Sequence, residues 1–139
     1  MSIKALNPYL FFNGTAAKAI ALYERALGAQ VESLQHYRDV PGQACTAESG
    51  ERVMHALLRL GGHQLMASDT PLGREAPAAG TNHVCLDFTE EAELRAAFDA
   101  LAEGGTVEMP PHDTFWGATF ASLTDAYGIS WLLNHTQPR

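Results

Sequence analysis

HVCLDF at residues 83–88, EEAELRAAFDALAE at residues 90–103 and GGTVE at residues 104–108 form the stretch that decides the fold. Apolar residues alternate in its first part, as in a β-strand, and recur at three- and four-residue spacing in its second part, as in a helix. Glycine then ends the helix, and an extended segment follows. The same order occurs earlier in the chain, because a shift of 76 positions (86 − 10 = 76) superposes Leu10 on Leu86 and Gly28 on Gly104. Such an internal repeat predicts two copies of one structural unit.

Each copy is predicted to fold as a β-α-β-β-β unit. The first comprises strands 5–12, 30–37, 52–60 and 63–68, with a helix between Thr15 and Leu27. The second comprises strands 83–88, 106–109, 120–123 and 129–133, with the helix 90–103. Gly61-Gly62 between two extended runs predicts a hairpin with a type I′ turn, which needs positive φ at both positions. Residues 38–51 are the longest irregular stretch and are expected to form a mobile loop.

The composition is that of an ordinary soluble globular protein, with 46% hydrophobic and 18% charged residues among 139. Nine basic and sixteen acidic side chains give a net charge of −7. This charge argues against non-specific binding to nucleic acid or anionic membranes, since both need a basic face. No apolar run approaches the roughly 20 residues that cross a bilayer, and the N-terminus lacks the apolar segment of a signal peptide. Two cysteines are too few for a disulfide framework, so we expect a reduced, cytoplasmic protein.

Several motifs along the chain resemble those of one known superfamily. They are Leu6-Asn7-Pro8-Tyr9, Ala19-Ile20-Ala21-Leu22-Tyr23 with Leu27-Gly28-Ala29, the strand around His55, Met66-Ala67-Ser68-Asp69, Asp113-Thr114-Phe115-Trp116-Gly117 and TDAYGISWLLN at residues 124–134. Nearly the whole chain thereby resembles the vicinal-oxygen-chelate superfamily of glyoxalase I, bleomycin-resistance proteins and extradiol dioxygenases, and more narrowly its PhnB-like branch. Proteins of this branch often carry a methyltransferase name. No glycine-rich turn that would hold a nucleoside cofactor follows the first strand, so methyl transfer is not supported.

The resemblance implies an α+β fold of two tandem β-α-β-β-β modules, about 4–69 and 81–135, joined by a linker at about 70–80. Together the modules would make a single domain over residues 1–139, with curved mixed sheets around a cavity and the helices outside. A homodimer is expected, with modules paired within or between chains. Strand alternation assigns the faces. Val84, Leu86 and Phe88 suit the helix side, whereas His83, Cys85 and Asp87 face the cavity, as do Val53, His55, Leu57 and Arg59.

Metalloenzymes of this superfamily take ligands from the first and last strand of each unit. The resemblance places Asn7 and His83 at the first-strand positions, and Met66 and Leu132 at the last-strand positions, four residues after each hairpin glycine. Only His83 is a good ligand, because a thioether and an isobutyl group cannot hold a hard or borderline divalent ion. By position, the inherited chelate is broken.

A relocated metal site is the alternative. His55 and His83 would meet across the cavity, and Asp87, Glu48 or Glu51 would complete a two-histidine, one-carboxylate set for Zn, Fe, Mn or Mg. The competing interpretation is that both histidines are hydrogen-bonded residues lining a polar cavity.

The predicted ligand-binding residues are Tyr9, His55, Arg59, His83, Phe115 and Trp116. Phe115 and Trp116 would form an aromatic wall against a ligand, or else would plug a barrel end or a dimer contact. Arg59 would clamp a carboxylate or phosphonate, or reach past the strand end to solvent. The sequence identifies no catalytic residues.

Two functions therefore stay open. One is a protein that binds a small molecule in the concave cavity without the inherited metal, in the manner of bleomycin-resistance proteins. The other is a divalent-metal-dependent lyase, isomerase or dioxygenase that uses His83 with displaced ligands. The same fold hosts both, so whether the chain is an enzyme is left open.

Overall fold

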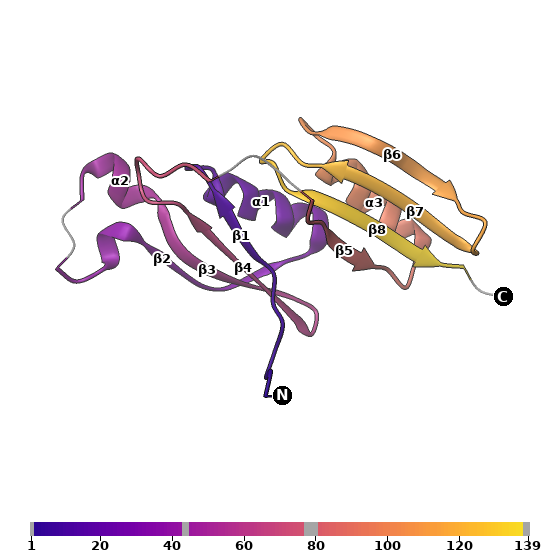
Figure 1. Cartoon of the computed structure of the whole chain (residues 1–139), viewed down its shortest axis with the longest axis horizontal. Coiled ribbons are helices and arrows are strands. Elements are labelled where there is room, and N and C mark those ends of the chain that lie inside the picture. The colour runs from indigo at the N-terminus through magenta and orange to yellow at the C-terminus, as the bar shows by residue number, and fades with distance from the viewer. Residues whose placement is uncertain (1, 43–44, 77–80, 138–139) are drawn as a thin grey trace. The chain divides into compact units, whose positions relative to one another are not determined.

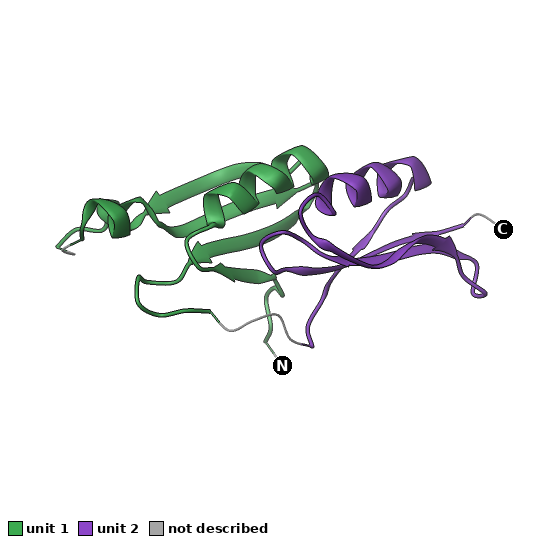
Figure 2. Cartoon of the chain, turned by 90° about the horizontal axis from the view of Figure 1, so that it is seen from above, with its two compact units in different colours: residues 1–77 green, residues 78–139 purple. Residues whose placement is uncertain are grey.

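The computed structural model describes residues 2–42, 45–76 and 81–137, and the chain divides into two compact units, residues 1–77 and 78–139 (Figure 2). Unit 1 contains β1 (Tyr9–Phe12), α1 (Ala16–Leu27), β2 (Gln30–His36), the 3-10 turn η1 (Tyr37–Asp39), α2 (Ala47–Glu51), β3 (Val53–Leu60) and β4 (His63–Asp69). Unit 2 contains β5 (Val84–Asp87), α3 (Glu91–Leu101), β6 (Thr106–Asp113), β7 (Ala118–Thr124) and β8 (Ser130–Thr136) (Figure 1). The α+β class and the tandem β-α-β-β-β order are confirmed.

Both units have the same sheet topology. Unit 1 has the strand order β1-β4-β3-β2 and unit 2 the order β5-β8-β7-β6. The outer strands β1 and β5 run parallel to β4 and β8, while the other pairs are antiparallel, so both sheets are mixed and unclosed. That the two sheets surround one cavity, and that the modules end near residues 69 and 135, stay predictions.

The repeat extends to irregularities of the backbone. The register between β2 and β3 skips one residue at Glu32, and the register between β6 and β7 skips one at Glu108, 76 positions later (108 − 32 = 76). Gly28 and Gly104 both adopt left-handed conformations, with φ of 67° and 71°. An extra residue at the same place in both sheets is a β-bulge of the repeated unit, which bends each strand there.

Each helix covers one face of its own sheet. α1 packs on β3 and β4, and α3 packs on β7 and β8. The apolar stripe predicted for the second helix is buried as expected, namely Leu94, Ala97, Phe98 and Leu101. In β1, Leu10 and Phe12 are buried on the helix side, as strand alternation predicts. Within the described ranges, no helix is long and apolar enough to cross a membrane.

Three sequence predictions need correction. The stretch 38–51 is not wholly irregular, because it contains part of η1 and all of α2; its residues 43–44 lie outside the described ranges. The hairpin turn has positive φ at Gly61 (60°) but not at Gly62, which is the φ pattern of a type II′ turn rather than type I′. Val53 is buried in the core instead of joining the inward mixed face. The register shifts between His55 and Val53, so alternation breaks at that point.

We predict that Gly105→Ala destabilises unit 2 by about 1–3 kcal/mol, the range for overpacking a well-filled site. A Cβ at Gly105 would lie 2.3 Å from the carbonyl oxygen of Thr124, and a backbone atom cannot move aside. Gly62→Ala is the matched control, because its Cβ would meet nothing within 4 Å. Urea denaturation of both variants measures the difference. Equal midpoints for Gly105→Ala and Gly62→Ala would contradict the prediction.

Candidate functional site

Each sheet leaves the face opposite its helix open. In unit 1, Tyr9 and Phe11 alternate with the buried Leu10 and Phe12, and both rings are exposed on that face. Their ring centroids lie 4.8 Å apart with an interplanar angle of 27°, so the rings are stacked. Strand alternation thus places two aromatic rings side by side at the edge of the sheet.

Tyr9 also joins two strands that are not neighbours. Its hydroxyl lies 3.2 Å from Nδ1 of His55 on β3, and the two ring centroids lie 5.8 Å apart. If the imidazole proton is on Nε2, the phenol donates to Nδ1 and the Nε2–H group is left as a donor for another molecule. Two predicted ligand-binding residues are therefore brought together.

Arg59 is the third predicted residue of this unit. Its guanidinium forms an ion pair with Glu32, the bulge residue of β2, and both side chains are partly exposed. Arg59 pairs in register with Gln30, so Glu32 reaches it from two residues further along β2. A role for Arg59 in binding a ligand stays a prediction.

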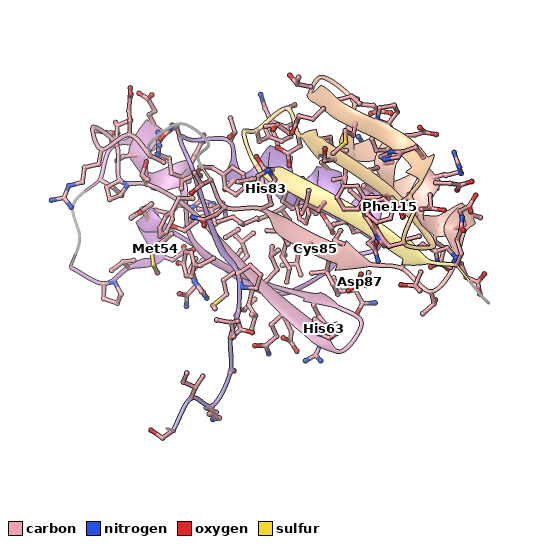
Figure 3. All side chains as sticks on the ribbon, turned by 45° about the vertical axis from the view of Figure 1, so that its right-hand side comes forward. Met54, His63, His83, Cys85, Asp87 and Phe115 are labelled. Atoms are coloured by element: carbon pink, nitrogen blue, oxygen red, sulfur yellow. The ribbon has the colours of Figure 1, made fainter. Side chains whose placement is uncertain are left out.

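In unit 2, one row of side chains crosses all four strands of the open face. Asp87 pairs in register with Asn134, Asn134 with Phe120, and Phe120 with His112. Asn134 Nδ2 donates a hydrogen bond of 3.0 Å to Asp87 Oδ1. Cys85 and Asp87 follow one another along β5, after His83 (Figure 3). All three side chains are exposed, as strand alternation predicts.

An aromatic cluster lies at one end of this row. Phe115 packs edge-to-face on Trp116 at 5.0 Å between ring centroids, Trp116 on Phe120 at 6.1 Å, and His112 on Phe120 at 6.2 Å. Phe115 is 97% exposed and Trp116 is 58% exposed. We call these four residues, Phe115, Trp116, Phe120 and His112, the aromatic cluster. These edge-to-face geometries are favourable arrangements for aromatic pairs.

The turn that presents the cluster is held by its own residues. Ala118 N–H donates to Thr114 Oγ1, and Thr114 Oγ1–H donates to the Ala118 carbonyl, both at 3.1 Å. Gly117 has φ of 84°, which a side chain would oppose. The sequence predicted Phe115 and Trp116 but missed Phe120 and His112, which join them only through the register of β6 with β7.

The surroundings of Cys85 disfavour its thiolate form. Partial burial of the sulfur, followed by the charge of Asp87, raises the pKa of Cys85. A thiol that stays protonated near neutral pH is a poor nucleophile and a poor metal ligand. The open face of unit 2 therefore offers aromatic, carboxylate and amide groups rather than a nucleophile at this position.

Comparisons with known proteins agree with this architecture. Residues 5–133 match the model of the Glyoxalase/Bleomycin resistance protein/Dioxygenase superfamily. The chain belongs to this superfamily. It is 34% identical to Protein YjdN of Escherichia coli (strain K12), over 93% of each chain.

Solved structures show the same fold. PA1353 of Pseudomonas aeruginosa is 36% identical over 99% of this chain and 100% of that chain, with a TM-score of 0.87. A PhnB protein of Bacillus cereus is 25% identical over 95% and 99% of the two chains, with a TM-score of 0.78. The resemblance to the PhnB-like branch is confirmed.

The strand register shows which residues surround the positions where the resemblance places the metal ligands of the superfamily. Met66 lies beside Tyr9 in the β1–β4 pair, and Leu132 lies beside Cys85 in the β5–β8 pair, so the two last-strand positions are equivalent. Neither side chain suits a hard divalent ion. Among the described residues, no three His, Cys, Asp or Glu side chains are grouped to hold a metal. The donors gathered within each unit therefore do not fit the inherited site. His55 and His83 belong to different units, so a joint site with Asp87, Glu48 or Glu51 stays a prediction.

Proposed function

We propose that this protein binds a small molecule on the open sheet faces without the inherited metal chelate. One observation carries the proposal: the open faces present side chains suited to contact a ligand, but at two positions where a metal ligand is expected they carry side chains that do not suit a hard divalent ion. Stacked or clustered aromatic rings are exposed there. Met66 and Leu132, which the resemblance places at the last-strand ligand positions, lie beside Tyr9 and Cys85 on the same faces. Exposed aromatic rings beside a few polar groups are typical of ligand sites.

Each face would contribute a different kind of contact. In unit 1, Tyr9 and Phe11 would supply apolar area, and the His55 imidazole bonded to Tyr9 would supply a directed hydrogen bond. In unit 2, Trp116 and Phe115 would cover a planar group at low entropic cost, because aromatic side chains have few rotatable bonds. His83 and Arg59 would lie at the margins. Such a protein would sequester or carry its ligand.

Metal content and thermal stability test the proposal together. We expect dialysed protein to hold far less than one equivalent of metal, and its melting midpoint to stay unchanged with Zn, Mn, Fe(II) or Mg. A metal ion present at a free concentration of about 100 times its Kd would add ~2.7 kcal/mol to the free energy of unfolding and raise the midpoint measurably. A midpoint rise that His83→Ala or His55→Ala abolishes would instead support the metal-dependent lyase, isomerase or dioxygenase.

A panel of small organic compounds tests binding in the same assay. We expect at least one compound to raise the midpoint of the wild-type chain, and Tyr9→Ala or Trp116→Ala to remove that rise. The exposed Ala17→Ser on α1 serves as a control away from both faces. A panel without any midpoint shift would count against the proposal.

We further expect two copies of the chain to associate, as the resemblance implies, with modules paired within or between chains. A cytoplasmic location and the absence of a nucleic-acid partner remain expectations from composition and charge.

A further inference from the structure

The net charge of the chain is divided very unevenly between its two units. Residues 1–77 hold seven basic and seven acidic side chains, whereas residues 78–139 hold two basic and nine acidic ones, so the whole net charge of −7 belongs to unit 2 (2 − 9 = −7). Its basic residues are Arg95, which pairs with Glu91 on α3, and Arg139, which lies outside the described ranges. Among the described residues, the open face of unit 2 therefore carries no arginine or lysine.

The repeat shows this difference at one pair of equivalent positions. In unit 1 the bulge residue Glu32 is neutralised by Arg59, whose register partner is Gln30. In unit 2 the equivalent bulge residue is Glu108. Thr106 is equivalent to Gln30, and its register partner is Thr124, so a threonine stands where unit 1 has Arg59. The Thr124 hydroxyl donates to Glu108 at 3.3 Å, which leaves the carboxylate its negative charge. The same backbone position is thus charge-balanced in one copy and anionic in the other.

Two carboxylates lie on the same face as the aromatic cluster, without contacting it in the part of the chain that the structure describes. Asp87 lies two strands from Phe120 in the same row, about 10 Å away at the usual strand spacing. Its partner Asn134 is a neutral amide, so the hydrogen bond leaves the charge in place. Glu108 is near Thr124, four residues from Phe120 along β7. Aromatic faces attract cations, and the attraction grows with the negative potential around them.

We propose that the open face of unit 2 selects organic cations that carry an ammonium, amidinium or guanidinium group beside a planar or apolar part. The aromatic cluster would take the planar part and attract the cation, while Asp87 and Glu108 would supply the negative potential. This inference rests on the proposed function, because it names the class of small molecule that one of the two faces takes.

Three probes of nearly the same shape isolate the effect of charge. Benzamidine is a cation near neutral pH, benzamide is neutral and benzoate is an anion. The two tryptophan indole N–H signals of a ¹H–¹⁵N spectrum give the readout and its internal reference, since Trp116 is exposed and Trp131 is fully buried. We expect benzamidine to shift the Trp116 signal with a Kd about tenfold below that of benzamide, with benzoate weaker still and Trp131 unmoved.

Variants separate a local effect from net charge. Asp87→Asn is expected to weaken benzamidine binding about threefold and to leave benzamide unchanged, and Glu108→Gln to act in the same direction. Asp99→Asn removes the same charge from the exposed side of α3 and is expected to change neither Kd.

The inference is overturned if benzamide or benzoate binds as tightly as benzamidine, if no probe moves the Trp116 signal, or if Asp99→Asn weakens binding as much as Asp87→Asn does. The proposed function survives each of these results as long as any compound of the panel raises the melting midpoint. Its own failure is a panel without any shift, so the two failures are distinguishable.

Discussion

Asp69→Ala is expected to destabilise unit 1 by about 3–5 kcal/mol, the largest effect of any single carboxylate in this unit. Asp69 is 2% exposed at the end of β4. Its Oδ1 accepts from the N–H groups of Gly14 at 2.8 Å and Ala16 at 3.0 Å, and its Oδ2 accepts from Val53 N–H at 2.9 Å. The side chain of Thr15, the N-cap residue of α1, makes no capping hydrogen bond, so Asp69 at the end of β4 caps the helix instead. Alanine would leave these donors without a partner.

Urea denaturation followed by far-UV circular dichroism measures this loss. Asp99→Ala on the exposed side of α3 is the matched control and is expected to change stability by no more than about 0.5 kcal/mol. Asp69→Asn keeps one acceptor oxygen and should fall between the two variants. A midpoint for Asp69→Ala close to that of Asp99→Ala would show that water replaces the carboxylate.

Trp131→Ala is expected to cost about 3–5 kcal/mol in unit 2. The indole is fully buried on β8, and its Nε1–H donates to Asp125 Oδ2 at 2.9 Å. Asp125 also accepts from the N–H groups of Tyr127 and Ile129 through Oδ1, so the indole is tied to the carboxylate that closes the β7–β8 hairpin. Removing the ring leaves both a cavity and a weakened turn.

Trp116→Ala is the matched control, because it deletes the same side chain from a position that is 58% exposed. We expect it to change the free energy of unfolding by about 0.5 kcal/mol and to remove the rise of the melting midpoint that a bound compound causes in the wild-type chain. The two tryptophans should therefore separate stability from binding. Similar losses of stability in both variants would contradict this division.

The fold could be predicted largely from spacing, because a repeat constrains every element twice. The stripe of Leu94, Ala97, Phe98 and Leu101 and the alternation of residues 83–88 were sufficient to orient α3 and β5. Alternation failed at Val53, since the one-residue shift of register beside it depends on hydrogen bonds that no local pattern reveals.

The candidate site was predicted only in part, for a related reason. Tyr9 and His55 are 46 residues apart and meet across β4, and the sequence predicts both as ligand-binding residues without pairing them. Phe120 and His112 lie beside each other in the aromatic cluster because β6 pairs with β7, and this pairing cannot be derived from local sequence patterns. The same holds for the ion pair between Glu32 and Arg59, which lie on different strands. Asp69 was read as part of a family motif, yet its partners Gly14 and Ala16 are 55 and 53 residues away.

The bulges at Glu32 and Glu108 each insert one extra residue into an outer strand of the sheet. Deleting either residue would leave its neighbours with their present register partners, Val31 with Leu58 and Ser33 with Leu57 in unit 1, and therefore on their present faces, because the bulge already absorbs the extra residue. The deletion would instead remove the local bend of the strand and, in unit 1, the carboxylate that pairs with Arg59. Each copy of the unit therefore holds one additional acidic residue at the same place in its outer strand, without changing the face on which any neighbouring side chain lies.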